Sequence, residues 1–144
     1  MLRATAIVSS ILCLTFITTG ACSSLGTPSS EAVVLAFKDE GVPMGDYYPV
    51  EEVEGWTTSI VPKTYTEGTH FDIPGMGAGH GGQVFVFEND EDLKVMVDYY
   101  ESLPDMSPML HSHLYVEKLV MLQIRGTLPK SNADRYGEVL EQEV

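Results

Sequence analysis

The sequence predicts an α+β fold in which a four-stranded, mainly antiparallel sheet carries helices packed on one face. Apolar residues recur with helical spacing in three segments, within residues 31–41, 89–104 and 129–140. Between these segments lie two pairs of strand-length apolar runs. Strands that are close in sequence pair antiparallel, so we expect the order helix, strand, strand, helix, strand, strand, helix.

The first helix is expected to begin near Glu31 after a serine N-cap and to stop at Gly41. Its buried face would consist of three residues spaced i, i+3, i+4: Val33, Ala36 and Phe37. Residues 42–68 hold three prolines and the only tryptophan, Trp56. We expect irregular chain there, with at most one short strand.

The first strand pair is expected on either side of a glycine-rich loop. Residues 70–73 alternate polar and apolar side chains, and Pro74 ends that strand. Residues 84–87 are apolar on both faces, which indicates a central strand. The loop 75–82 lacks the lysine and the following helix of a phosphate-binding loop, so we interpret it as a connection that uses positive φ angles.

The second helix gives the clearest helical pattern. Asn89 is a good N-cap, and the acidic residues 90–92 suit the first turn, where the helix dipole favours anions. This acidic run lacks the regular spacing of a calcium-binding loop. We expect Pro104 to close the helix. The expected buried stripe is Leu93, Met96, Val97 and Tyr100.

The second strand pair is expected at residues 110–117 and 119–124, with a tight turn near Lys118. One face of the first strand would carry Leu110, Ser112, Leu114 and Val116, and the other His111, His113, Tyr115 and Glu117. A last helix would start within residues 129–131. It would bury Ala133, Tyr136 and Leu140.

The N-terminal residues have the layout of a secretory signal. Arg3 precedes a mostly apolar run, residues 4–17, which is shorter than the roughly 20 residues that span a bilayer. The following Thr19-Gly20-Ala21-Cys22 resembles a bacterial lipobox, although leucine is usual at the place of Thr19. That resemblance implies cleavage before Cys22 and a diacylglycerol on its thiol. The alternative is ordinary secretory cleavage, which leaves a free N-terminal cysteine.

Three regions follow from this reading: a signal peptide at 1–21, a flexible tether at 22–30 and a single α+β domain at 31–144. Cys13 would be lost with the signal, so the mature chain could form no internal disulfide. Lipidation would account for the remaining Cys22. The expected location is the extracytoplasmic face of a cell membrane.

The domain also resembles a group of small uncharacterised bacterial lipoproteins. The resemblance rests on the segments 71–74, 82–87, 99–100 and 122–126 and on Tyr136. It implies an exported, lipid-anchored α+β domain and assigns no catalytic residue.

Charge limits the partners that we expect. Beyond the signal the chain has seven basic residues against 21 acidic ones, a formal charge of −14. Such a surface repels nucleic-acid phosphates, so we expect no nucleic-acid binding. The expected partners are the membrane, through the diacylglycerol anchor, and another envelope protein. We expect no cofactor.

The main alternative function is metal binding. His111 and His113 would point to one face of a strand, and Met106 and Met109 precede them closely. Imidazole and thioether together suit copper, and imidazole also suits zinc.

The leading functional hypothesis is a non-catalytic binding or accessory module of the cell envelope. The sequence contains no nucleophile elbow, no zinc-protease motif and no cysteine nucleophile in the domain, so we do not expect an enzyme. A hydrolase is a third hypothesis. A pocket with converging polar groups would favour a hydrolase, whereas a flat or filled sheet face would favour the binding module.

Overall fold

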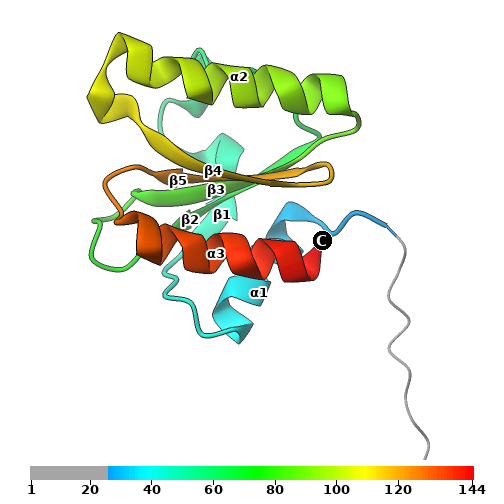
Figure 1. The fold of residues 1–144 in the computed structure, drawn as a ribbon, viewed down its shortest axis with the longest axis vertical. Coiled ribbons are helices and arrows are strands. Elements are labelled where there is room, and N and C mark those ends of the chain that lie inside the picture. The colour runs from blue at the N-terminus through cyan, green and yellow to red at the C-terminus, as the bar shows by residue number, and fades with distance from the viewer. Residues whose placement is uncertain (1–25) are drawn as a thin grey trace, which may run out of the picture.

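The computed structural model describes residues 26–144, which form three α-helices and a five-stranded antiparallel sheet (Figure 1). The helices are α1 (Ser30–Asp39), α2 (Asp90–Met106) and α3 (Lys130–Glu143). The strands are β1 (Tyr47–Pro49), β2 (Glu67–Asp72), β3 (Gly81–Val86), β4 (Ser112–Glu117) and β5 (Val120–Arg125). Short 3₁₀ turns follow at η1 (Val50–Glu52), η2 (Trp56–Thr58) and η3 (Pro108–Leu110). The predicted signal peptide, the lipobox and Cys22 lie outside the described residues.

The α+β class and the antiparallel pairing are confirmed, but the predicted number of strands is wrong. The sheet order is β1-β2-β3-β5-β4, and every neighbouring pair is antiparallel. The additional strand, β1, lies in the segment 42–68 and pairs Tyr48 with His70 at the sheet edge. Three residues are too few to carry a strand pattern. This strand therefore exists because β2 offers it a partner.

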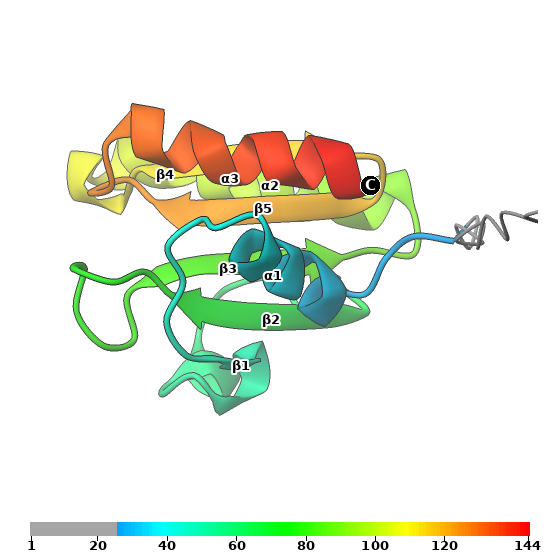
Figure 2. The same ribbon diagram turned by 90° about the horizontal axis from the view of Figure 1, so that it is seen from below.

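The helices do not all lie on one face, which corrects the predicted layering. Helices α1 and α3 cover one face of the sheet and α2 covers the other (Figures 1 and 2). The physical reason is that the central strands are apolar on both faces. Val84 points toward α1 and α3, whereas the next residue, Phe85, points toward α2. Both faces must therefore be buried.

Three aromatic rings hold the face under α1 and α3 together. The ring centroid of Phe37 lies 5.3 Å from that of Phe71 and 5.4 Å from that of Tyr136. The Tyr136 hydroxyl donates a hydrogen bond to the carbonyl oxygen of Pro43 at 2.5 Å, so its polar end is paired. The strands contribute Val84, Val86, Val120, Leu122 and Ile124 to this core.

The face under α2 is assembled from the helix and from the turns η1 and η2. Phe85 and Met121 form its floor. Gly68 permits the close approach of η1, because a Cβ at that position would lie 2.8 Å from Cγ2 of Val50 and 2.9 Å from Cδ1 of Phe85. The other buried members of this core are Trp56, Phe87, Leu93, Met96 and Tyr100.

The helix starts agree closely with the prediction. The backbone N–H of Asp92 donates to Oδ1 of Asn89 at 2.9 Å, which confirms the N-cap of α2. Pro104 does not close α2, however, because the helix continues to Met106. A proline this near the C-terminus removes only one helical hydrogen bond, and the N–H of Ser107 still bonds to Leu103. Within residues 26–144, none of the helices has the length and apolarity needed to cross a membrane.

Candidate functional site

A row of polar side chains crosses the sheet on the face that α2 covers. Strand register places His70 opposite Gln83 and Gln83 opposite Gln123. Directly opposed residues point to the same face of a sheet, so these three side chains lie side by side. The neighbouring row on the same face is apolar and contains Phe85 and Met121. The polar row therefore begins where the apolar core under α2 ends.

A cleft lies over this polar row, and we call it the sheet-end cleft. Its volume is about 240 Å³. One wall comes from Tyr100 of α2, and the opposite wall comes from Val53 and Trp56. The remaining lining residues are His70, Gly79, His80, Gly81, Gly82, Gln83, Gln123 and Arg125.

Both glutamines of the floor are held by hydrogen bonds. The hydroxyl of Tyr100 donates to Oε1 of Gln83 at 3.1 Å. Nε2 of Gln123 donates to Oγ of Ser112 at 2.8 Å. Oε1 of Gln83 and Nε2 of Gln123 are thus hydrogen-bonded to the protein. Nε2 of Gln83 and Oε1 of Gln123 have no hydrogen-bond partner among residues 26–144. The floor therefore offers one amide donor and one amide acceptor to a ligand.

His70 is the most buried polar residue of the cleft, with 4% of its surface exposed. Its Nε2 lies 3.1 Å from Oδ1 of Asp72, which also accepts a hydrogen bond from the N–H of Gly79 at 3.0 Å. The Tyr48 ring packs on the imidazole at a centroid distance of 5.0 Å. Nδ1 of His70 is buried and has no hydrogen-bond partner within the described chain. More than about 90% of buried polar groups in proteins have a hydrogen-bond partner, so this atom is an exception.

The glycine-rich loop and Arg125 form the mouth of the cleft. Gly75, Gly77 and Gly79 have φ angles of 91°, 95° and 72°, which confirms the prediction of a loop built on positive φ. The Arg125 side chain is exposed. No carboxylate among residues 26–144 lies within ion-pair distance of it.

The side chains of the lining include one hydroxyl and no thiol. No serine, threonine or cysteine is among the lining residues. The only hydroxyl is that of Tyr100, and burial raises the pKa of this phenol far above its ordinary value of 10.0. It therefore stays protonated and acts as a hydrogen-bond donor.

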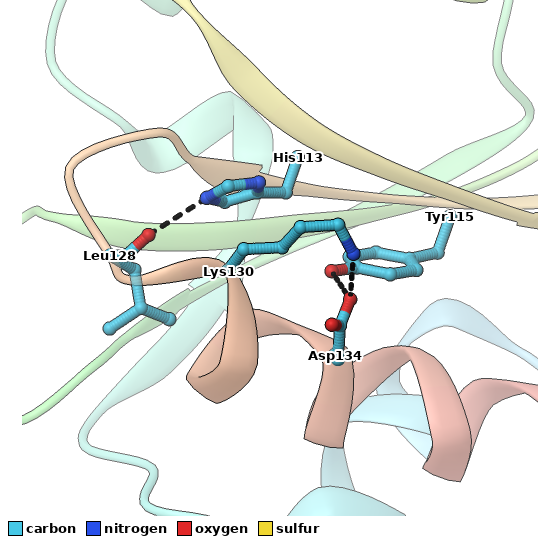
Figure 3. Close-up of polar contacts among 5 residues, drawn as sticks. All are labelled: His113, Tyr115, Leu128, Lys130 and Asp134. Carbon is cyan, nitrogen blue, oxygen red and sulfur yellow. Dashed lines mark hydrogen bonds and ion pairs between the residues drawn. The ribbon is translucent and has the colours of Figure 1, made fainter.

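The structure places the predicted metal ligands outside the cleft, at β4 and the turn before it. The rings of His111 and His113 do lie together, with centroids 5.1 Å apart and planes nearly perpendicular. The imidazole of His113, however, is half-buried and faces the loop that leads into α3. Its Nε2 bonds to the carbonyl oxygen of Leu128 at 2.8 Å (Figure 3).

Both methionines of the predicted site are largely exposed. Met106 is 73% exposed at the end of α2, and Met109 is 89% exposed in η3. Within residues 26–144, no group of three or more His, Cys, Asp or Glu side chains is arranged to hold a metal ion.

A second polar cluster joins β4 to α3 next to His113 (Figure 3). Oδ1 of Asp134 accepts hydrogen bonds from the Tyr115 hydroxyl at 2.8 Å and from Nζ of Lys130 at 2.6 Å. The bond from Lys130, followed by the bond from Tyr115, lowers the pKa of the Asp134 carboxyl below its ordinary value of 3.8. Burial and the Asp134 contact raise the pKa of Tyr115. This cluster fixes α3 to the sheet edge.

Sequence reasoning missed the cleft, although it left a signal. Gln83 and Gln123 each interrupt an otherwise apolar strand. A polar residue on the buried face of a central strand is a candidate floor for a ligand site. Only the strand register shows that the two glutamines are neighbours and that His70 joins them.

No protein-family model matches this chain, and no solved structure is significantly similar to it.

Proposed function

We propose that this protein is a lipid-anchored module of the cell envelope that binds a small polar ligand in the sheet-end cleft without catalysing a reaction. The observation that carries the proposal is the polar floor of His70, Gln83 and Gln123 next to the apolar core under α2. Polar side chains on a buried sheet face cost stability unless they are paired. A bound polar ligand would pair these side chains and offset that cost.

The absence of a suitable nucleophile in the lining supports binding in preference to hydrolysis. His70 has a carboxylate partner in Asp72, as a general base would. The usual third member of such an arrangement, a serine, threonine or cysteine side chain, is not among the cleft residues.

The position of the tether supports an outward-facing site. The backbone N–H of Ser30 donates to Oε1 of Glu67 at 2.5 Å, so the chain enters the fold at the beginning of β2. Gly81 and Arg125 mark the other end of the sheet, roughly 17 Å away for a six-residue strand. Figures 1 and 2 show the described residues before α1, 26–29, and the glycine-rich loop at opposite ends of the molecule. A membrane anchor at Cys22 would therefore leave the cleft open to the periplasm or medium.

The acidic surface supports the same choice of partners. The formal charge of −14 on the residues after the predicted signal disfavours nucleic acids and anionic lipid headgroups. The protein would contact the membrane through the diacylglycerol on Cys22. Its other partner, in addition to the small ligand, would be another envelope protein.

Ligand binding can be tested with a panel of small polar metabolites and the full-length chain in a non-ionic detergent. A ligand of the cleft should raise the thermal midpoint of the wild type and lose this effect in the double variant Gln83→Leu, Gln123→Leu. Gln142→Leu is the matched control, because Gln142 is exposed on α3. A ligand that stabilises the double variant as strongly as the wild type would place binding elsewhere and contradict the proposal.

The anchor can be tested separately by the variant Cys22→Ser. We expect the variant to lose its lipid label and to leave the membrane fraction, because the thiol is the attachment point. Cell fractionation with a radiolabelled fatty acid measures both effects. Cys13→Ser is the control, since Cys13 lies in the predicted signal. Unchanged membrane attachment and labelling of the Cys22 variant would refute the lipoprotein hypothesis.

Metal binding by His111 and His113 is the second candidate function, and the 5.1 Å separation of their rings favours it. A chain with both cysteines replaced by serine would be titrated with Cu(I), Cu(II) and Zn(II) in enough salt to screen the acidic surface. The candidate requires a 1:1 complex that is lost in His111→Ala, His113→Ala and kept in His80→Ala. Weak binding that these substitutions do not change would exclude it.

A further inference from the structure

We infer that the ligand of the sheet-end cleft is a small monocarboxylate that also carries hydroxyl or amide groups, with its carboxylate on Arg125. This inference rests on the proposed ligand-binding function and names the chemical class of the ligand. Three observations carry it: an arginine without a carboxylate partner, a floor with free amide groups, and the size and charge of the cleft.

Arg125 is the cationic residue that lines the cleft, and it has no acidic partner among residues 26–144. The chain has 21 acidic residues, and two exposed lysines of its helices, Lys94 and Lys130, form ion pairs with Asp98 and Asp134. Arg125 forms none with the residues the structure describes, although it lines the cleft. Its planar guanidinium can therefore bind a carboxylate with two parallel hydrogen bonds.

The floor beside Arg125 is suited to a neutral polar group. Arg125 and Gln123 are two residues apart on β5 and point to the same face of the sheet. Because Oε1 of Gln83 is bonded to Tyr100 and Nε2 of Gln123 to Ser112, the NH₂ group of Gln83 remains as a donor and the carbonyl oxygen of Gln123 as an acceptor. A hydroxyl or amide on the ligand satisfies both, because such groups donate and accept at once.

Size and charge argue against larger or more highly charged anions. A volume of about 240 Å³ is below the range of about 300–1,000 Å³ that holds drug-sized ligands, so a molecule of metabolite size fits. Arg125 is the only lining residue with a permanent positive charge. In a chain with a formal net charge of −13, one guanidinium balances a monoanion and leaves a dianion such as phosphate uncompensated.

His70 provides an independent indication that this end of the sheet is a binding site. The residue is almost fully buried, it lines the cleft, and its Nδ1 has no partner in the described chain. The bond between its Nε2 and Asp72 fixes the ring orientation before any ligand arrives. The cleft is thus pre-organised on its β2 side, which lowers the entropic cost of binding.

The inference is tested with two pairs of probes that differ only in charge: gluconate against gluconamide, and lactate against lactamide. Calorimetric titration of the full-length chain in a non-ionic detergent measures each affinity. We expect a carboxylate to bind at least about tenfold more tightly than its amide, because a charge-assisted hydrogen bond replaces a neutral one. Inorganic phosphate should bind more weakly than the better carboxylate.

The variants separate Arg125 from the general charge of the protein. Arg125→Gln should reduce the affinity for the carboxylate to that for the amide, and Arg125→Lys should restore only part of it. Arg135→Gln is the matched control, because Arg135 is exposed on α3 and makes the same change in net charge. The affinity of Arg135→Gln for the carboxylate should stay within about twofold of that of the wild type.

Three results would overturn the inference. Equal affinity for carboxylate and amide, or an unchanged affinity in Arg125→Gln, would show a cleft that binds ligands without recognising a carboxylate, and the proposed function would survive. If the wild type binds neither carboxylate, this ligand class is wrong. The metabolite panel with the Gln83 and Gln123 double variant then decides the proposed function independently.

Discussion

The two faces of the sheet differ in how completely they are filled. The face under α1 and α3 is apolar from Phe71 to Ile124, and the rings of Phe37 and Tyr136 close it. The face under α2 is apolar only around Phe85 and Met121. Beyond them, the polar row begins.

This difference shows how one sheet can serve both stability and binding. Two helices cover the first face, whereas one helix and two short turns cover the second. Tyr100 on α2 and Trp56 in η2 do not fill the space above the polar row, and this space is the sheet-end cleft. The face under α1 and α3 can stabilise the fold, whereas the face under α2 has polar side chains in place of some apolar contacts.

The largest effect is expected from a cavity in the filled face. Phe71→Ala removes a fully buried ring that contacts both Phe37 and Tyr136, so we expect a loss of about 3–5 kcal/mol in the free energy of unfolding. Chemical denaturation measures it. Tyr47→Ala, at an exposed aromatic residue of β1, should cost less than about 1 kcal/mol. Similar losses for both variants would contradict the assignment of the main core to this face.

A smaller but still substantial effect is expected in the core under α2. Met96 is fully buried on the predicted stripe of α2, and Met96→Ala should cost about 2–5 kcal/mol. Met109→Ala is the matched control, because Met109 is 89% exposed and should cost less than about 0.5 kcal/mol. If Met96→Ala were as mild as Met109→Ala in denaturant titrations, α2 would not be a core helix.

The polar row should respond differently from the apolar rows beside it. Gln83→Leu loses the bond from Tyr100 but gains apolar area, so we expect stability to change by no more than about 1 kcal/mol. The reverse exchange on the filled face, Val84→Gln, buries an unpaired carboxamide and should cost at least about 2 kcal/mol. Equal costs in thermal unfolding would remove the distinction between the two faces.

The smallest effect is expected at the exposed Asp134 cluster, and it should depend on pH. Because the folded state lowers the pKa of Asp134, its contribution is present above the ordinary value of 3.8 and is lost as pH falls through the folded value. Asp134→Asn should therefore lower the thermal midpoint at pH 7 and have a smaller effect near pH 2. Glu138→Gln is an exposed control on the same helix. An effect of Asp134→Asn that grows on acidification would have the wrong sign.

The sequence by itself determined the helices and most of the strands. The N-cap at Asn89 and the buried Ala133 and Tyr136 of α3 agree with the structure. Of the predicted stripe on α2, Leu93, Met96 and Tyr100 are buried and Val97 is only partly buried. Local chemistry decides these features, because caps and helical periodicity depend on residues within a few positions of one another. The positive φ angles of the glycine-rich loop follow from the same kind of local argument.

Tertiary structure decided the layering, the strand β1 and the cleft. Each depends on contacts between residues far apart in the chain. Tyr48 becomes a strand residue only beside His70, and Gln83 and Gln123, 40 positions apart, become neighbours only through the pairing of β3 with β5. His113 has the strand face that its spacing predicts, but its hydrogen bond to Leu128 exists only because the chain after β5 turns back across that face. Periodicity specifies which side chains share a face, whereas packing decides what covers that face.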